Sequence, residues 1–420
     1  MSGLSQKRRV LILGGSPFQV PLIEYAKTQG DYVITADYLP DNPGHRLSDE
    51  YHNVSTTDID AVVAVGRDLN IDAVMTFASD PALPAVAKTT EALGLHGISV
   101  ATVEMLTRKD RFRRLLEHLA LPCPKNLRLS AGESTSSSVL SAIKALRLPI
   151  VVKPTDASGS KGVRKLDDFD GLFDALDLAL KESRCGECIV EEYIEGHQVH
   201  GDVFFREGTP CFSYYGDHEF VTANGVQVPV TTKWPSRASA ESLAQLERQL
   251  TLLAQASGYL DGPMNVEARI AENGWVYLID ISPRNGGNNV PIILEALTGF
   301  NFRKAVYDLA VFGQSERQGE YNVRLAGAYY VLHSHQPGKL TKIDFSEAVK
   351  ERAIRFDCFK RVGDWVDCFT AHNRAIGSLS LGFSSVEERD LILRDIASHV
   401  IVACEPDSVR SAENANQKAE

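Results

Sequence analysis

Two carboxylates and an arginine lie where the chain predicts a hairpin. Glu267 falls in one apolar segment, 264–270, while Asp280 and Arg284 fall in or just after the next, 275–281, and an Asn-Gly turn joins the segments. An ionised carboxylate inside an apolar alternation needs a partner or a cation. Paired across the hairpin, the carboxylates would form an oxygen-only site suited to Mg²⁺ and nucleotide phosphates, and the arginine could grip a phosphate with two N–H groups. A structural network of acid and arginine side chains is the alternative.

A second candidate site is a strand that ends in a lysine and continues into a small-residue loop. Residues 148–154 read Leu-Pro-Ile-Val-Val-Lys-Pro, with Lys153 at the strand end, and residues 156–163 carry two serines, two glycines and a second lysine. Small residues let backbone N–H groups approach phosphate oxygens closely. No Gly-Lys-Ser/Thr opens a helix here, which excludes a Walker loop. The pattern favours a phosphate site, and a plain hairpin turn is the alternative.

A third segment, residues 188–196, places three glutamates in a strand-like run, Cys-Ile-Val-Glu-Glu-Tyr-Ile-Glu-Gly. Carboxylates with few cations nearby are costly unless they are solvated or functional. The segment is therefore either part of a binding site or an exposed acidic edge strand.

The elements that must position these residues follow an α/β order. The first hundred residues alternate apolar runs at 9–13, 32–36 and 73–76 with helix-like segments at 21–29, 61–70 and 84–93. This alternation predicts a parallel sheet with right-handed crossovers. We further expect helices over 107–119, 170–182 and 240–257, a strand over 323–332, and a helix running into a strand over 385–402. Residues 407–420 are polar and aperiodic, so we expect a disordered tail.

Composition limits the class of protein. A chain of 420 residues should divide into two to four modules, and 44% hydrophobic with 24% charged residues is typical of a soluble globular protein. The net charge of −11 argues against nucleic acid or an anionic membrane as the main partner. No apolar run is long enough for a signal peptide or a membrane span. Seven cysteines without a disulfide-framework spacing favour a reducing, cytoplasmic location.

Taken in order, these motifs resemble the ATP-grasp superfamily, in particular the branch of biotin carboxylase and carbamoyl-phosphate synthetase. The resemblance covers nearly the whole chain and implies an α/β and α+β fold with three domains. Residues 1–104 would form a Rossmann-like domain, 105–315 the ATP-grasp domain with ATP between its two lobes, and 316–406 a C-terminal closing domain.

The resemblance implies which residues contact ATP. Lys109 and Lys153 match the two phosphate-contacting lysines. The residues that match the flexible loop over the β- and γ-phosphates are Ser158, Gly159, Ser160, Lys161 and Gly162. The residues that match the adenine hinge are Glu191, Glu192, Tyr193 and Ile194, with backbone groups of Glu192 and Ile194 contacting the base.

The resemblance also implies the reacting end of the site. Glu267 and Asp280 match the metal ligands for Mg²⁺, with Mn²⁺ as an alternative, and Arg284 matches the arginine near the transferred phosphate. Arg284 and Lys153 are therefore the predicted catalytic residues. Charge neutralisation by these groups and closure of a loop would suit phosphoryl transfer.

Three positions depart from the family pattern. The ribose-binding glutamate is replaced by Gln198, whose amide can still bond hydroxyl groups. The second metal carboxylate is the shorter Asp280 where the family usually has Glu, and the position two residues later, usually Asn, is Ser282. Ser282 is therefore a weak third metal ligand, and the departures leave open whether one or two metals bind.

Other features favour structural interpretations. Gly14-Gly15-Ser16 lacks the full dinucleotide pattern and is expected to be a strand-to-helix turn. Cys185 and Cys188 lack a second pair, so we expect free buried thiols rather than a zinc or redox site. His197 and His200 should face opposite sides of a strand, and His333 and His335 should share a strand face without a third ligand. The basic run formed by Lys88, Arg108, Arg111, Arg113 and Arg114 is expected to be a solvated helix face.

The resulting hypothesis is an ATP-dependent ligase that activates a carboxylic acid as an acyl phosphate and couples it to an amine, giving an amide, ADP and phosphate. Its partners would be small-molecule acids and amines, and a homodimer is left open. We expect residues 214–234 to shape the acid or amine pocket. Two alternatives remain: an ATP-grasp enzyme with another acceptor, such as a carboxylase, and a nucleotide-binding protein that has lost catalysis.

Overall fold

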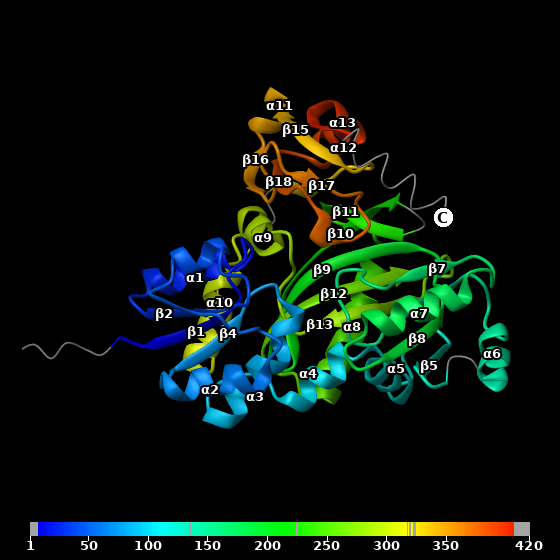
Figure 1. The fold of residues 1–420 in the computed structure, drawn as a ribbon, viewed down its shortest axis with the longest axis horizontal. Helices are drawn as coiled ribbons and strands as arrows, with labels where there is room; N and C mark the ends of the chain where they lie inside the picture. The colour runs from blue at the N-terminus through cyan, green and yellow to red at the C-terminus, as the bar shows by residue number, and fades with distance from the viewer. Residues whose placement is uncertain are drawn as a thin grey trace, which may run out of the picture.

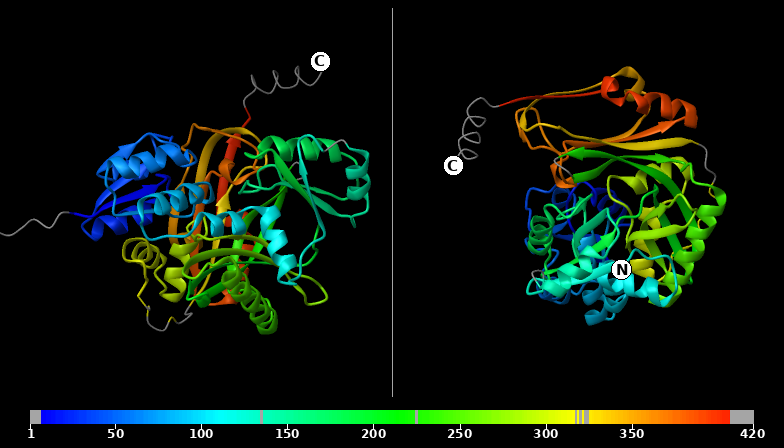
Figure 2. Two further views of the ribbon diagram at one scale, coloured as in Figure 1. Left: turned by 90° about the horizontal axis from the view of Figure 1, so that it is seen from below. Right: turned by 90° about the vertical axis from the view of Figure 1, so that its right-hand side faces the viewer.

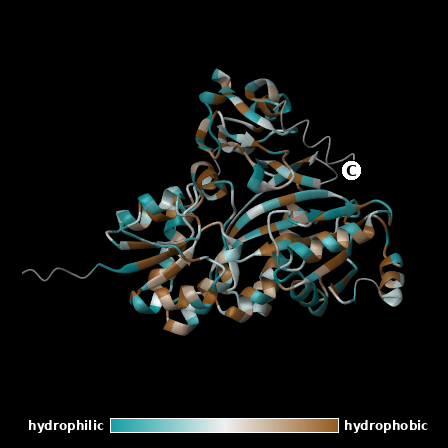
Figure 3. Cartoon of the chain, viewed as in Figure 1, coloured by the Kyte–Doolittle hydropathy of each residue, from teal (hydrophilic) through white to brown (hydrophobic). Residues whose placement is uncertain are grey.

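The N-terminal region is the predicted parallel sheet with helices. The computed structural model describes residues 7–133, 136–223, 226–316, 318, 321 and 325–406. Its first sheet has the order β3-β2-β1-β4, with β1 Arg9–Leu13, β2 Tyr32–Ala36, β3 Glu50–His52 and β4 Ala73–Thr76. The helices of this region are α1 Val20–Thr28, α2 Ile59–Asp68 and α3 Leu83–Leu93, with short 3-10 turns at Pro43–Arg46 and Asp80–Ala82. Hydrophobic residues run along these strands in Figure 3 because both faces of the sheet are covered.

Two short helices connect this region to a small antiparallel sheet. The helix predicted over 107–119 is present as α5 Lys109–His118, and a further helix, α4 Val100–Thr107, ends just before it. Arg108 between them is extended, and the backbone N–H of Lys109 donates to Thr155. The small sheet has the order β5-β8-β6-β7, with β5 Asn126–Ser130, β6 Ile150–Pro154, β7 Arg164–Leu166 and β8 Glu187–Glu192, and it carries α6 Ser137–Lys144 and α7 Leu172–Glu182.

The centre of the molecule is an eight-stranded antiparallel sheet with the order β13-β12-β9-β10-β11-β14-β18-β16 (Figure 1). Its first five strands in sequence are β9 His197–Arg206, β10 Thr209–Ala223, β11 Val226–Trp234, β12 Gly262–Ile270 and β13 Val276–Ser282. The helices that accompany them are α8 Ala240–Ser257, α9 Val290–Thr298 and α10 Phe302–Phe312. The 240–257 helix and the hairpin of β12 and β13 are therefore present as expected.

The C-terminal segment extends this sheet with β14 Ala326–Leu332, β16 Ala353–Cys358 and β18 Gly377–Phe383, and β14 pairs with β11. A further sheet of order β17-β15-β19 combines β17 Trp365–Val366, β15 Gly338–Phe345 and β19 Val400–Glu405. The remaining helices are α11 Glu347–Lys350, α12 Val386–Arg394 and α13 Ile396–His399, with a 3-10 turn at His372–Arg374. The right-hand view of Figure 2 shows these elements along one side of the molecule, next to the strands of the large sheet.

Several predictions about this segment are now resolved. The segment 385–402 is helical and then extended, but Asp395 separates two helices. His333 and His335 lie beyond the end of β14 and not on a strand. Part of the predicted 323–332 strand, and the tail at 407–420, lie outside the described residues. The division into three domains remains a prediction.

Among the described residues, no helix combines the length and apolar character needed to cross a membrane.

Candidate active site

A β-bulge brings Glu267 and Asp280 together. In the β12–β13 hairpin, Ala268 lies opposite Leu278, but the next pair is Glu267 with Asp280, because the register shifts between them. A regular ladder would have put Ile279 opposite Glu267 and turned Asp280 to the other face, since side chains alternate along a strand. The extra residue therefore places both carboxylates on one face of the large sheet.

The neighbours of Glu267 and Asp280 only partly neutralise the negative charge of the two carboxylates. Lys109 Nζ is 3.4 Å from Asp280, and the Gln198 side-chain amide donates to Glu267 at 3.1 Å. Burial, and then the charge of Asp280, raise the pKa of Glu267 to about 7. Two facing carboxylates with one nearby ammonium form a site that a cation would stabilise.

Behind this pair lies a buried charge cluster formed by Arg113, Lys153 and Glu191. Arg113 Nε and Nη2 donate to the Glu191 carboxylate at 2.7 and 3.2 Å, and Lys153 Nζ is 2.7 Å from the same carboxylate. Burial opposes ionisation of Glu191, but the two cations outweigh it and lower its pKa to about 2. The predicted alternative of an exposed acidic edge strand was wrong for β8, because β8 lies between β5 and β6 and Glu191 is buried.

Arg113 also reaches the bulge. Its Nη1 donates to the carbonyl oxygen of Leu278 at 3.3 Å, and its Nη2, which also donates to Glu191, donates to the carbonyl oxygen of Ile279 at 2.8 Å. The prediction that Arg113 belongs to a solvated helix face was wrong, since its side chain is fully buried. One side chain on α5 therefore binds both the hinge strand β8 and the strand that carries Asp280.

Arg284 is held by a residue of the N-terminal region. Its Nε and Nη2 donate to the two oxygens of Asp80, each at 2.7 Å, and its Nη1 donates to the backbone of Asn285 at 2.8 Å. Burial raises the pKa of Asp80, but the charge and hydrogen bonds of Arg284 lower it further than burial raises it. The hydroxyl of Ser282 donates to the same Asp80. Ser282, the doubtful metal ligand, is thus engaged with a carboxylate of another region.

A cavity of about 420 Å³ brings most of the predicted residues together. Its lining includes Lys109, Lys153, Ser158, Gly159, Ser160, Glu191, Glu192, Tyr193, Ile194, Gln198, Glu267, Asp280 and Arg284. An adjoining cavity of about 630 Å³ is also lined by Lys109, Glu267, Asp280 and Arg284, and in addition by Ser282. Lys161 and Gly162 line neither cavity. Gly162 instead has a φ of +69°, and a Cβ there would contact Pro154 and Glu182 below 3 Å.

The hinge is shaped by contacts between the two sheets. The Arg269 guanidinium lies 4.4 Å from the Tyr193 ring centre and donates to the carbonyl of Ile194 at 3.1 Å. Lys165 lies over the same ring at 4.7 Å. The backbone N–H of Glu192 donates to Lys125, so that group is not available for the predicted contact with a base.

The residues present fit Mg²⁺. Glu267 and Asp280 supply oxygen atoms only, which Mg²⁺ prefers, and their mutual repulsion is relieved by a cation. No group of three or more His, Cys, Asp or Glu among the described residues could hold a metal. Mg²⁺ commonly completes its coordination with phosphate oxygens and water, so two protein carboxylates are sufficient.

Some residues of the site were not found from the sequence. Asp80 follows β4, and side chains just after a parallel strand often line a ligand crevice, which was an available signal. Arg113 was also missed. It lies four residues after Lys109 on α5, so the two side chains share a helix face, and this spacing was an available signal. His200 lines the cavity, whereas His197 pairs with Asp217 at 2.7 Å, as expected for opposite faces of the strand. Cys188 is buried and Cys185 exposed, both as free thiols, so the prediction of buried thiols holds for one of them.

Comparison with known proteins identifies one domain of this chain. Residues 146–291 match the model of the ATP-grasp domain. Residues 146–291 of this chain therefore form an ATP-grasp domain. The chain is 26% identical over 320 residues to the formate-dependent phosphoribosylglycinamide formyltransferase of Parasynechococcus marenigrum (strain WH8102), covering 72% of this chain and 78% of the relative.

Two solved structures share the fold. The L-amino acid ligase of Bacillus licheniformis is 22% identical with a TM-score of 0.81, over 95% of this chain and 99% of that one. The biotin carboxylase domain dimer of Hydrogenobacter thermophilus 2-oxoglutarate carboxylase, solved with MgADP, ADP and bicarbonate, is 15% identical with a TM-score of 0.74, over 94% and 91%. The predicted ATP-grasp fold is confirmed by these likenesses.

Arg113 should be essential for stability. Arg113→Met leaves Glu191 buried with one cation, and breaking such a buried pair typically costs about 3–5 kcal/mol. Urea denaturation should therefore show a large loss of unfolding free energy. Arg111→Met, on the exposed side of the same helix, is the matched control and should change stability by less than about 1 kcal/mol. Equal losses in both variants would contradict the assigned role.

Glu191 should make stability depend on acid pH. Its pKa is lowered in the folded state, so its contribution is present above pH 4.5 and is lost as pH falls towards about 2. The difference in unfolding free energy between the natural protein and Glu191→Gln should therefore shrink by about 3 kcal/mol over this range. Chemical denaturation at a series of pH values measures it, and a pH-independent difference would refute the ion-pair assignment.

Proposed function

We propose that this ATP-grasp protein activates a carboxylic acid as an acyl phosphate and couples it to an amine, releasing ADP and phosphate. The observation that carries the proposal is a single cavity that joins the hinge, two buried lysines, a carboxylate pair and an arginine. Groups of these types at one end of a nucleotide-sized cleft suit the transfer of a phosphoryl group to a carboxylate.

The nucleotide would lie between the two sheets. Tyr193 and Ile194 border the base, while Lys109 and Lys153 lie where they can neutralise phosphate charge. Burial lowers the pKa of Lys153. The Glu191 carboxylate, which pairs with the Lys153 ammonium, opposes this shift. Ser158, Gly159 and Ser160 line the same cavity and supply donors for phosphate oxygens.

In the first step a carboxylate oxygen of the acid attacks the γ-phosphorus, the bond to the β-phosphate oxygen breaks, and ADP leaves. Mg²⁺ bound by Glu267 and Asp280 would supply charge neutralisation to the phosphate oxygens. Three of the five N–H groups of Arg284 are used by Asp80 and Asn285, so its orientation is set before the acid binds. Its other N–H groups are the donors that we assign to the acid or the acyl phosphate.

In the second step the amine nitrogen attacks the acyl carbon, the carbon–oxygen bond to phosphate breaks, and the amine loses a proton. The products are an amide and inorganic phosphate. Positioning and charge neutralisation provide the rate enhancement, so no covalent intermediate with the protein is needed.

The relatives support a carboxylate–amine ligation but differ in their substrates. One relative is named as a formate-dependent formyltransferase and one as an L-amino acid ligase, while a third was solved with bicarbonate. The partners that we propose are therefore small acids and amines. A carboxylase-like acceptor and a protein that only binds nucleotide are the alternatives that the assay below distinguishes.

Turnover should be detected as ADP release that requires Mg-ATP and an acid. A panel of acids and amines, with bicarbonate as a separate arm, identifies the acceptor class. AMP and pyrophosphate as products would contradict the acyl phosphate. ATP binding by calorimetry without turnover on any pair would instead support the nucleotide-binding alternative.

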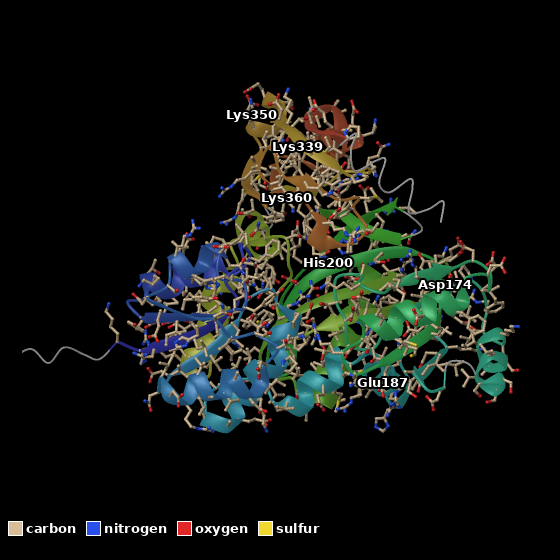
Figure 4. All side chains as sticks on the ribbon, in the orientation of Figure 1. Asp174, Glu187, His200, Lys339, Lys350 and Lys360 are labelled. Atoms are coloured by element: carbon tan, nitrogen blue, oxygen red, sulfur yellow. The ribbon has the colours of Figure 1, made fainter. Side chains whose placement is uncertain are left out.

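Asp280→Asn should lower kcat by at least about 100-fold, because one ligand of the proposed metal site loses its charge. The Asp280 side chain is 42% exposed, so the fold should remain intact and the thermal midpoint should be nearly unchanged. Asp174→Asn on the exposed surface of α7 (Figure 4) is the control and should keep full activity. Retained activity in Asp280→Asn would remove this residue from the site.

A further inference from the structure

The sheet face that carries the carboxylate pair continues into a wall of aromatic rings. Glu267 on β12 is opposite His200 on β9, and the His200 ring stacks on His218 of β10 with centroids 4.3 Å apart and planes at 11°. His218 Nε2 lies 3.9 Å from Glu267 Oε1. The wall therefore begins at the proposed metal site.

Beyond His218 the wall continues along β10 and onto β14. Phe220 and Tyr329 each meet the His218 ring edge-on, with centroids at 5.8 and 6.4 Å. The hydroxyl of Thr232 lies 2.6 Å from His218 Nδ1, which fixes the orientation of that ring. His200, His218, Phe220 and Tyr329 all line the first cavity, and we call these four residues the aromatic wall.

Further apolar residues line the same cavity. Phe18 from the N-terminal region and Val290 at the start of α9 are two of them, and Pro229 of β11 pairs with Phe220 and so lies on the same sheet face as the wall. Of the charged residues that line this cavity, Asp80 and Arg284 pair with each other, and Glu267 lies at the start of the wall. An anionic side chain laid along the wall would face the Glu267 carboxylate and four rings, and burying a charge without a cationic partner is costly.

We propose that the aromatic wall is the side-chain pocket of the acid substrate and that this acid carries an aromatic group. The inference rests on the proposed function and adds a substrate class to it. The wall starts within 4 Å of Glu267, so an acid whose carboxylate reaches the γ-phosphate would lay its side chain along these rings. Offset or edge-on ring contacts then select aromatic over small or acidic side chains.

Phe220 is suited to test this pocket because it is only half-buried and is none of the residues that we assign to the nucleotide or the metal. The full-length protein with Mg-ATP is given L-phenylalanine, L-alanine or L-glutamate, and hydroxylamine serves as the nucleophile that converts an acyl phosphate to a hydroxamate. The natural protein should prefer phenylalanine in kcat/KM. Phe220→Ala should reduce the ratio of phenylalanine to alanine about tenfold, mainly through KM.

A second variant tests whether the residue at position 220 can reverse the preference from aromatic to acidic side chains. Phe220→Arg places a cation at the end of the pocket and should raise the ratio of glutamate to phenylalanine at least about tenfold. Phe173→Ala is the matched control, since this phenylalanine is 58% exposed on α7 and lines neither cavity, and it should leave all ratios unchanged. Unchanged ratios in both Phe220 variants, or a change in amine preference alone, would overturn the proposal.

Failure of the proposed function gives a different result. In that case no acid supports ADP or hydroxamate formation in any variant. Calorimetry with L-phenylalanine in the presence of Mg-ADP still tests the pocket, because it needs no turnover. The natural protein should bind L-phenylalanine about tenfold more tightly than Phe220→Ala, and equal affinities, or no binding to either, would overturn the pocket.

Discussion

The buried carboxylate of Glu191 and its two cations are the interaction on which the cleft depends. Arg113 satisfies this carboxylate and, with the same guanidinium, the carbonyl oxygens at the β13 bulge. An unpaired charge at this depth would be strongly destabilising, so α5, β8 and β13 have to remain in contact. Strand β8, Lys153 and the strand with Asp280 are thereby held as one unit.

The bulge turns this structural unit into a site. A hairpin of regular register would point Asp280 away from Glu267 and leave the cleft with one carboxylate. The two Arg113 hydrogen bonds end on the carbonyls of Leu278 and Ile279, where the ladder is irregular and such groups otherwise lack partners. Arg113 therefore stabilises the β-bulge, and the bulge places Glu267 and Asp280 together as the acidic pair that suits Mg²⁺.

A second coupling connects the N-terminal region to the reacting end. Asp80 follows a strand of the first sheet, yet its carboxylate accepts two hydrogen bonds from Arg284 and one from Ser282, the last residue of β13. The arginine is consequently oriented by a residue some two hundred positions away in sequence. The aromatic wall likewise depends on segments far apart in sequence. Its rings come from β9, β10 and β14, which the eight-stranded sheet brings onto one face.

The sequence alone determined the elements and most of the chemical groups. Alternation of apolar runs with helices located β1, β2 and β4, and the Asn-Gly turn located the hairpin, because these signals are local and repeat with the period of the backbone. The motif order was enough to identify Lys109, Lys153, Glu267 and Asp280 as cavity residues. The tertiary structure alone decided which polar groups are buried and paired. Arg113 looked like one of several surface cations, and Asp80 had no signal of charge pairing, since burial and pairing depend on segments far apart in the chain and not on neighbours in sequence.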